Sequence, residues 1–207
     1  LGEWSFMGFD FKVGRGVLIP RDDTEVVVNL CIDFLENRTD KKTVDLCSGS
    51  GAIAVALDKI SGAEVTAVEI DETAFSYLET NVKENNSSVK PVMADALEIC
   101  ETFADGEFDL IVSNPPYIKS ADIETLQKEV RLEPRLALDG GEDGCDFYRE
   151  IVSRWSRKLK KGGALAFELG ENQADAVKAL MTDKGFSDFK ISLDFGGVQR
   201  AIIGTLL

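Results

Sequence analysis

The sequence predicts an α/β fold, with a mostly parallel β-sheet, helices on both of its faces and a short β-hairpin at the N-terminus. Strand-like and helix-like segments alternate from residue 43 to residue 184, which is the pattern of a parallel sheet built from strand–helix units. Residues 108–113 are apolar enough for a strand that is buried on both faces. The length of 207 residues, 44% of them hydrophobic, suits a single domain over residues 1–207 with a sizeable core.

The N-terminal segment predicts the hairpin and the first helix. Aromatic and polar residues alternate around Gly8, which indicates a short hairpin within residues 1–18. Pro20 then precedes a helix that Asp22 or Asp23 is expected to cap. Apolar residues at helical spacing form the expected buried face of this helix: Val27, Leu30, Cys31 and Phe34.

The rest of the chain supplies the sheet and its remaining helices. Strands are expected over residues 43–46, 64–70, 89–93, 108–113 and 163–169, with a final β-pair over 190–193 and 201–206. Helices are expected over residues 52–59, after a cap at Asp71, and over 146–159 and 172–184. Ligands of such sheets bind outside the carboxyl ends of the strands, so a site is expected directly after the strands.

Charge and composition exclude several classes of function. With 23 basic and 37 acidic residues the net charge is −14, which disfavours broad contact with nucleic acid or with an anionic membrane. We interpret the one basic cluster, residues 157–161, as a solvated helix end that complements the helix dipole. No apolar run approaches the roughly 20 residues of a transmembrane span. The first residues do not resemble a signal peptide, so we expect a cytoplasmic protein.

The chain contains no histidine, which removes every mechanism that uses a histidine base. Its cysteines stand at positions 31, 47, 100 and 145 and form no C-x-x-C pair. A zinc site is therefore not expected, and we interpret the cysteines as free thiols.

Acidic and small residues follow three of the expected strands. The segment from Asp45 to Gly51 joins the first strand to its helix, and its glycines let the backbone approach a ligand closely. Glu69 ends the second strand, where a carboxylate can accept hydrogen bonds from two ribose hydroxyls. Asp95 follows the third strand, where an adenine ring would lie. These strand ends predict a nucleoside-cofactor site that comprises Asp45, Cys47, Ser48, Gly49, Gly51, Glu69, Ile70, Asp95 and Ala96.

Two observations favour S-adenosylmethionine over NAD as this cofactor, although Gly49-x-Gly51-x-x-Ala54 also fits the loose dinucleotide fingerprint. The acidic side chain of Asp45 suits a cationic ligand better than a pyrophosphate. The sequence also lacks the groups of hydride transfer, such as a catalytic histidine or a Tyr-x-x-x-Lys pair.

The segment Asn114-Pro115-Pro116-Tyr117 directly follows the fourth strand and is the candidate catalytic loop. Each proline fixes its own φ and pushes the preceding residue towards extended geometry, so the loop is stiff. Because prolines lack N–H groups, the loop offers mainly acceptors, to which Asn114 adds its side-chain carbonyl. These acceptors can take both hydrogens of a planar –NH2 group, and Tyr117 can stack on its flat face.

Such a loop suits methyl transfer to an amide or an aromatic amine. The lone pair of that nitrogen is delocalised and poorly nucleophilic. Acceptors on both N–H bonds raise its electron density and stabilise the positive charge that develops during attack. Orientation of the nitrogen in line with the methyl group of the donor lowers the barrier further. The proton can leave the nitrogen after transfer, so no base is required.

The catalytic loop and the glycine turn resemble the HemK family, the peptide chain release factor N5-glutamine methyltransferases. Further similar segments are residues 6–11, 18–25, 133–144, 167–173 and 194–200. The combination of Pro20-Arg21-x-x-Thr24-Glu25 with Asn-Pro-Pro-Tyr is the most specific part of this resemblance.

The resemblance implies a Rossmann-like class I methyltransferase fold with a seven-stranded sheet and S-adenosylmethionine as donor. It implies that the substrate is the glutamine of the Gly-Gly-Gln tripeptide in a release factor. Asn114 and Pro115 would bind the glutamine amide, and Tyr117 would flank it. Arg21, Thr24 and Glu25 would border the methionine end of the cofactor, together with Asn114. Glu168 and Arg200 are left outside the site, because they can equally be structural ion-pair partners.

The sequence departs from the family at two places. Cys47 and Ser48 stand where the family usually has glycine and threonine, but both are small, so cofactor binding is expected to be retained. The N-terminal helical domain that helps the family to engage the release factor has no counterpart here, so docking is expected to be weaker. We expect a monomer with a protein substrate and no direct contact with nucleic acid or membrane.

Alternative functions stay open at this point. A ribosomal-protein glutamine methyltransferase would use the same chemistry. A DNA or RNA adenine-N6 methyltransferase would share the Asn-Pro-Pro-Tyr loop, although the net charge of −14 argues against it. An alternative that is not an enzyme is a cofactor-binding module without catalysis. The intact Asn-Pro-Pro-Tyr loop argues against this alternative.

Overall fold

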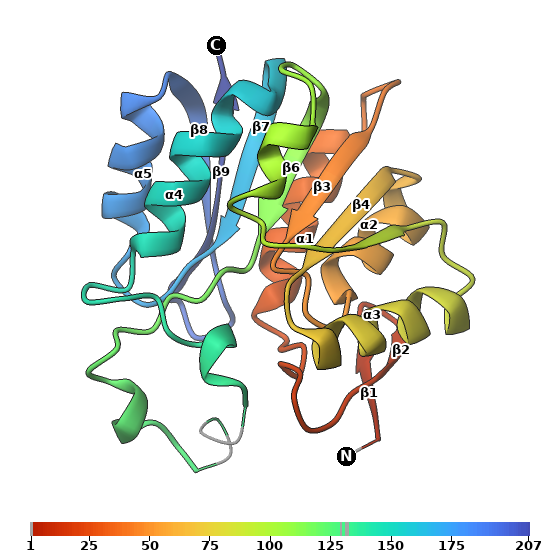
Figure 1. Cartoon of the computed structure of the whole chain (residues 1–207). Coiled ribbons are helices and arrows are strands. Elements are labelled where there is room, and N and C mark those ends of the chain that lie inside the picture. The colour runs from red at the N-terminus through yellow and green to blue at the C-terminus, as the bar shows by residue number, and fades with distance from the viewer. Residues whose placement is uncertain (1, 129, 131–132) are drawn as a thin grey trace.

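The computed structural model describes residues 2–128, 130 and 133–207, and its centre is a seven-stranded sheet (Figure 1). The strands lie in the order β5 (Lys90–Met93), β4 (Glu64–Glu69), β3 (Lys42–Leu46), β6 (Phe108–Ser113), β7 (Leu159–Glu168), β9 (Gln199–Leu206) and β8 (Phe186–Leu193). Neighbours from β5 to β7 pair in parallel, and β9 runs antiparallel to both β7 and β8. The predicted, mostly parallel sheet is confirmed. The strand order reverses between β3 and β6, which is where open sheets of this kind bind ligands.

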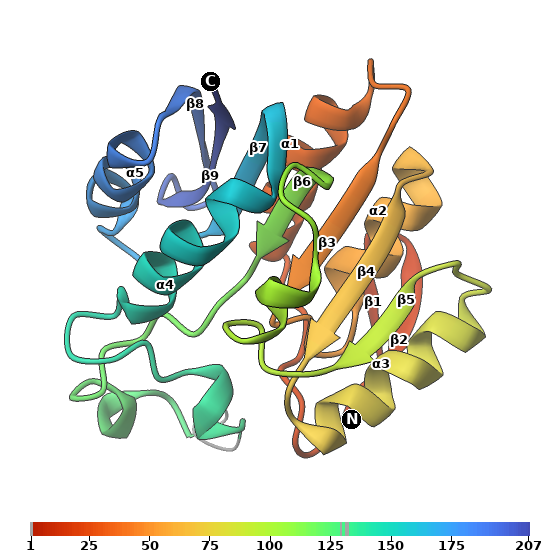
Figure 2. The same cartoon turned by 45° about the horizontal axis from the view of Figure 1, so that its top comes forward.

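Helices cover both faces of the sheet (Figures 1 and 2). The first three, α1 (Thr24–Leu35), α2 (Ala52–Ser61) and α3 (Glu72–Glu84), pack on one face, and α4 (Asp146–Trp155) and α5 (Ala174–Asp183) pack on the other. Alternate residues of β6 join the two cores: Leu110 and Val112 face the first group of helices and Ile111 the second. Short 3-10 turns lie at Ile99–Thr102, Ile123–Thr125, Arg135–Ala137 and Ser156–Lys158.

Strands β1 (Glu3–Phe6) and β2 (Phe9–Lys12) form the predicted hairpin. Met7 and Gly8 close it with positive φ values of 51° and 82°, a turn geometry that matches the twist of the strands. Asn81 of α3 holds the hairpin in place, because its side chain accepts from the Lys12 amide at 2.6 Å and donates to the Ser50 carbonyl at 2.9 Å. One buried amide therefore ties the hairpin to the turn after β3.

Of the two predicted helix caps, one is confirmed and one is wrong. The side chain of Asp71 accepts hydrogen bonds from the amides of Thr73 and Ala74 at 2.9 Å and caps α3. Asp23 occupies the cap position of α1, but it is itself helical and makes no capping hydrogen bond through its side chain. Its carboxylate lies 3.5 Å from the guanidinium of Arg200, a partner that the local sequence does not reveal. Asp22 contributes its backbone carbonyl, which accepts from the Glu25 amide.

The interpretation of residues 157–161 as a solvated helix end is wrong. Helix α4 ends at Trp155, and these residues form a 3-10 turn and the start of β7. Lys158 is only 3% exposed, and its ammonium donates to the Asp105 carboxylate and to the Phe103 carbonyl at 2.8 Å each. Lys160 donates to Asp109 at 2.8 Å. Acidic residues from other segments thus neutralise the cluster at the amino ends of β6 and β7.

Other boundaries differ by a few residues. Strand β4 ends at Glu69 instead of Ile70, β7 begins four residues earlier than predicted, and β8 begins at Phe186 instead of Lys190. Element ends depend on pairing and not only on periodicity, which explains these differences. Within the described residues, no helix is both long and apolar enough to cross a membrane.

Candidate active site

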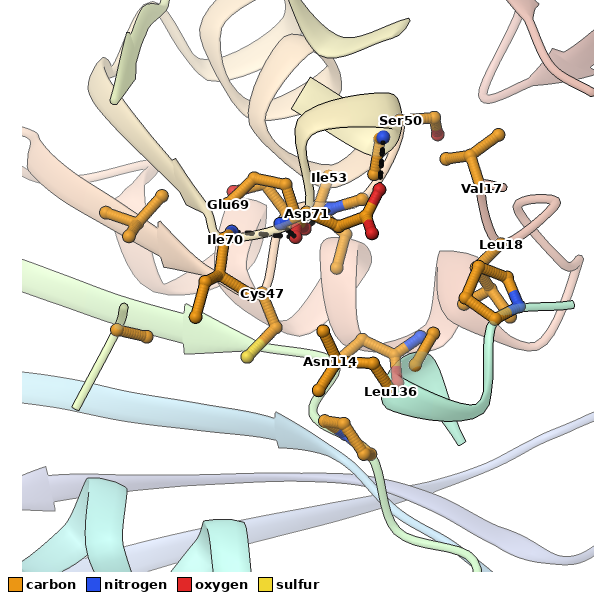
Figure 3. A pocket seen from close by; sticks show the side chains of 18 of the residues that line it. Val17, Leu18, Cys47, Ser50, Ile53, Glu69, Ile70, Asp71, Asn114 and Leu136 are labelled. Carbon is orange, nitrogen blue, oxygen red and sulfur yellow. Dashed lines mark hydrogen bonds between the residues drawn. The ribbon is translucent and has the colours of Figure 1, made fainter. Parts of the chain in front are cut away.

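A pocket lies at the carboxyl ends of β3, β4, β5 and β6, the sheet edge at which the sequence predicts a site (Figure 3). Each strand is followed by residues that line it: 47–50 after β3, 69–71 after β4, 94–97 after β5, and Asn114 with Pro116 after β6. In Figure 3, Glu69 and Asp71 lie on one side, Asn114 on the other, and Cys47 between them. Further lining residues are 16–18, Pro20, Thr24, Ala52, Ile53, Val68, Ala74, Pro134, Leu136, Ala137 and Phe147.

The turn after β3 depends on left-handed backbone conformations. Cys47, Gly49 and Gly51 have φ values of 60°, 55° and 82°, a region that costs residues with a Cβ roughly 1–2 kcal/mol. A Cβ at Gly51 would also lie 2.4 Å from Leu78 of α3, whereas a Cβ at Gly49 would meet nothing within 4 Å. Gly51 therefore allows α3 to pack closely beneath the pocket, and the missing side chain of Gly49 leaves space for a ligand in the pocket. The left-handed φ of Cys47 gives a reason for the family's usual glycine at this position.

Glu69 is held in one orientation by three backbone amides. Its Oε2 accepts from Gly49, and its Oε1 accepts from Ile70 and Asp71, each at 2.8 Å. The side chain is 8% exposed and lines the pocket. Three of the roughly four lone-pair sites of the carboxylate are used, and the site left on Oε2 fits a ribose hydroxyl.

The pocket has acidic groups and no described lysine or arginine in its lining. Its carboxylates belong to Glu69, Asp71 and Asp95; Asp95 Oδ1 accepts from the Leu97 amide at 2.7 Å. Asp45 lies beneath the turn, fully buried, and neither of its oxygens has a hydrogen-bond partner among the described residues. Burial raises the pKa of Asp45 to about 8, and the nearby Glu69 adds to the increase. The carboxylates of the lining fit a cationic sulfonium ligand and oppose a pyrophosphate, whereas Asp45, with its raised pKa, is largely neutral at pH 7 and adds little charge.

The catalytic loop leaves β6 at the edge of this pocket. Asn114 and Pro116 line the pocket, and Pro115 is buried between them in the chain. Among the described residues the Asn114 side chain has no hydrogen-bond partner, so its amide is available to a ligand. The phenol of Tyr117 points elsewhere: it donates to Glu168 Oε1 at 3.0 Å. Burial, followed by the charge of Glu168, raises the pKa of Tyr117, which keeps the phenol neutral.

Several predicted site residues do not line the pocket: Arg21, Glu25, Asp45, Gly51, Pro115 and Tyr117. One guanidinium nitrogen of Arg21, Nη2, donates to both carboxylate oxygens of Glu133, at 2.9 Å each. Glu25 accepts from the Met7 amide of the hairpin at 3.2 Å. Contacts of Arg21 and Glu25 with the cofactor therefore stay predictions that the geometry of the pocket does not support.

Other lining residues were not predicted. Pro134, Leu136 and Ala137 lie in the segment 133–144, and Leu18 lies in the segment 18–25, so the family resemblance carried a signal for them. No local motif marks Ile53 or Phe147, which reach the pocket from α2 and α4. Glu168 and Arg200 are not paired with each other, because the Arg200 guanidinium binds Asp194 at 2.9 Å.

Comparison with known proteins agrees with this geometry. The model of the "Methyltransferase small domain" family matches residues 21–135. The release factor glutamine methyltransferase of Geobacter sulfurreducens is 42% identical over 208 residues, covering 100% of this chain and 72% of the relative. That of Clostridium acetobutylicum is 40% identical over 203 residues, covering 96% of this chain and 70% of the relative. That of Fusobacterium nucleatum is 40% identical over 206 residues, with 98% of this chain but 58% of the relative covered.

Solved structures share the fold. A methyltransferase from Pyrococcus furiosus superposes with a TM-score of 0.70 at 22% identity, over 97% of this chain and 90% of that one. TYW2 of M. jannaschii in complex with AdoMet gives a TM-score of 0.60 at 16% identity, over 98% of this chain and 84% of that one. At this identity the likeness establishes the class I methyltransferase fold and nothing finer.

Proposed function

Because this chain belongs to the release factor glutamine methyltransferase family, we propose that it methylates the side-chain amide nitrogen, N5, of the glutamine in the Gly-Gly-Gln motif of a peptide chain release factor. The methyl donor is S-adenosylmethionine. The observation that carries the proposal is the position of Asn114, whose amide is available at the edge of an acidic pocket.

The lining of the pocket supports binding of this donor. Glu69, already oriented by three amides, would accept from a ribose hydroxyl through Oε2. Ile70, Asp95 and Ala96 would surround the adenine, and Thr24 with Asn114 would border the methionine end. The bound donor supplies a methyl group activated on a positively charged sulfur. The acidic lining suits that charge.

The catalytic loop would hold the glutamine amide. The side-chain oxygen of Asn114 and the backbone carbonyl of Pro115 would accept its two N–H hydrogens, which raises the electron density on the nitrogen. The prolines keep this loop stiff, so the amide is oriented before it reacts. No histidine exists in the chain to act as a base, and none is needed if the proton leaves after transfer.

We further propose that the chain acts as a monomer on a protein substrate and makes no direct contact with nucleic acid. The net charge of −14 supports the absence of nucleic-acid contact, because it repels a phosphate backbone.

The test is a methylation assay with labelled S-adenosylmethionine and three separate substrates: a release factor, ribosomal protein and duplex DNA. We expect label in the release factor alone, located by mass spectrometry on the glutamine of Gly-Gly-Gln. A release factor with alanine in place of that glutamine is the matched control and should stay unlabelled. Label in adenine would overturn the glutamine assignment, and preferential labelling of a ribosomal protein would move the substrate to that class.

A further inference from the structure

A buried carboxylate that the proposed mechanism does not use lies beside the catalytic loop. Glu168 is the last residue of β7 and is 2% exposed. The pairing of Ser113 with Phe167 brings the ends of β6 and β7 to the same level, so Glu168 lies next to the start of the loop. Its Oε1 accepts the hydrogen bond from the Tyr117 phenol at 3.0 Å.

This carboxylate is not explained by packing or by an ion pair. Its Oε2 is buried and accepts no hydrogen bond of ordinary geometry from the described residues, although the Thr24 hydroxyl lies near the carboxylate. Arg200, whose charge acts on Glu168, binds Asp194 at 2.9 Å and the Leu169 carbonyl at 3.2 Å instead. Burial raises the pKa of Glu168, and the charge of Asp23 adds to this increase. The hydroxyls of Thr24 and Tyr117 and the charge of Arg200 lower the pKa, but their effect is smaller. An apolar residue of similar volume usually stabilises such a position as well or better, so stability alone does not explain a glutamate.

Residues that follow Glu168 hold Tyr117 from two more sides. The side-chain amide of Gln173 donates to the Tyr117 carbonyl at 2.9 Å. Gln173 is itself fixed, since its Oε1 accepts from the Gly170 amide at 2.9 Å and from the Tyr148 phenol at 3.2 Å. A Cβ at Gly170 would come within 2.9 Å of the Tyr117 ring, so only glycine leaves the ring this close. Hydroxyl, ring and carbonyl of Tyr117 are thus all held by residues 168–173.

We propose that Glu168 is a positioning residue for methyl transfer: by binding the Tyr117 hydroxyl, it fixes the ring that flanks the target amide. This rests on the proposed function and on the role that the family resemblance implies for Tyr117, beside the glutamine. Its effect is on the orientation of the amide, and small losses of orientation are costly, since misplacement by about 1 Å can reduce a rate about 100-fold.

The test combines Glu168→Ala, Glu168→Gln, Tyr117→Phe and the double variant Glu168→Ala/Tyr117→Phe. For Glu168→Ala we expect kcat on the release factor to fall about 10- to 100-fold, with the cofactor Kd within about twofold of wild type. Glu168→Gln should recover most of the rate, because its amide oxygen still accepts from the phenol. Glu171→Ala, an exposed carboxylate of the same segment, is the control and should behave as wild type.

The double variant separates positioning from a merely structural role. Once Tyr117 has lost its hydroxyl, Glu168→Ala should change kcat less than about threefold further. An equal loss of kcat in both backgrounds overturns the proposal, because Glu168 would then act through another group. If Glu168→Ala does not fold, Glu168→Gln tests the proposal instead. If Glu168→Gln has a kcat as low as that of Tyr117→Phe and an unchanged melting temperature, the proposal is contradicted.

A second readout needs no substrate and therefore separates this proposal from the proposed function. The flipping rate of the Tyr117 ring, measured by NMR on ¹³C-labelled tyrosine and assigned with Tyr117→Phe, should rise at least about tenfold in Glu168→Ala and not in Glu171→Ala. An unchanged rate overturns the positioning role even if the release factor is methylated. If the protein methylates no release factor but the Tyr117 ring flips faster in Glu168→Ala, only the proposed function is contradicted and the positioning role of Glu168 stands.

Discussion

The Oε2 atom of Glu69 accepts a hydrogen bond from the Gly49 amide at 2.8 Å, which joins the end of β4 to the turn after β3. Two strand ends that line different parts of the pocket are therefore held as one unit. The same carboxylate binds the Ile70 and Asp71 amides, so it organises the pocket as well as offering an acceptor to a ribose hydroxyl.

For this reason we expect Glu69→Gln to weaken binding of S-adenosylmethionine about 10- to 100-fold. Hydrogen bonds to a charged group contribute about 1.5–3 kcal/mol each, and about 1.4 kcal/mol corresponds to a factor of ten. Isothermal titration calorimetry measures the change, with Glu79→Gln, an exposed carboxylate on α3, as a charge-matched control. An affinity equal to that of the control would remove Glu69 from the ribose site.

The two glycines of the turn should respond differently to alanine. Both have positive φ, so each substitution costs roughly 1–2 kcal/mol of backbone strain. Gly51→Ala adds a contact of 2.4 Å with Leu78 and should lower the melting temperature more than Gly49→Ala does. Gly49→Ala places its methyl group in open space at the pocket and should weaken cofactor binding more than its loss of stability explains. Equal loss of stability in the two variants would contradict this division of roles.

Asn114→Ala should reduce kcat about 100- to 1000-fold, the range observed when one positioned group that stabilises developing charge is removed. The cofactor Kd should change less than about fivefold, because Glu69 and the turn remain intact. Single-turnover kinetics and calorimetry separate the two effects, and Asn29→Ala, on the exposed side of α1, controls for the loss of an amide. A parallel loss of affinity and turnover would show that the loop serves the cofactor or the fold.

Asp45 should make the cofactor-free protein less stable as pH rises. Its pKa is 3.8 in the unfolded chain and about 8 in the folded protein, chiefly because of burial. Between these values the folded state retains a proton that the unfolded state releases, so this group lowers the free energy of unfolding from about pH 4 to pH 8. Asp45→Asn cannot ionise, so its stability relative to wild type should rise by at least about 1 kcal/mol, the equivalent of one pKa unit, between pH 4 and pH 8. Urea unfolding at the two pH values measures the difference, and a constant difference would contradict the buried, uncompensated carboxylate.

Arg21 and Glu133 should act as one unit that holds residues 134–137 against the pocket. Their ion pair joins the segment before α1 to the segment that supplies Pro134, Leu136 and Ala137. Because the Arg21 side chain is 45% exposed, although that of Glu133 is only 9% exposed, we expect each of Arg21→Ala and Glu133→Gln to weaken cofactor binding only about two- to fivefold, the upper part of the range for ion pairs at a surface. The double variant should be no weaker than either single one. Additive losses would indicate that Arg21 contacts the cofactor itself, as the family resemblance predicts.

The sequence alone determined much of this protein. Hydrophobic periodicity predicted the strands of the parallel sheet, and the rule that ligands bind at carboxyl ends of strands directed attention to Glu69 and Asn114, which do line one pocket. Asp71 as a helix cap was readable because a cap depends on residues two and three positions away.

The tertiary structure alone decided which side chains meet across the fold. Tyr117 and Glu168 are 51 residues apart, Lys158 and Asp105 are 53 apart, and Arg21 and Glu133 are 112 apart. Local pattern shows which residues are buried, but not which segments the strand order brings together. The basic cluster was therefore misinterpreted, and Glu168 gained a role beside Tyr117 only once the register of β6 and β7 was known.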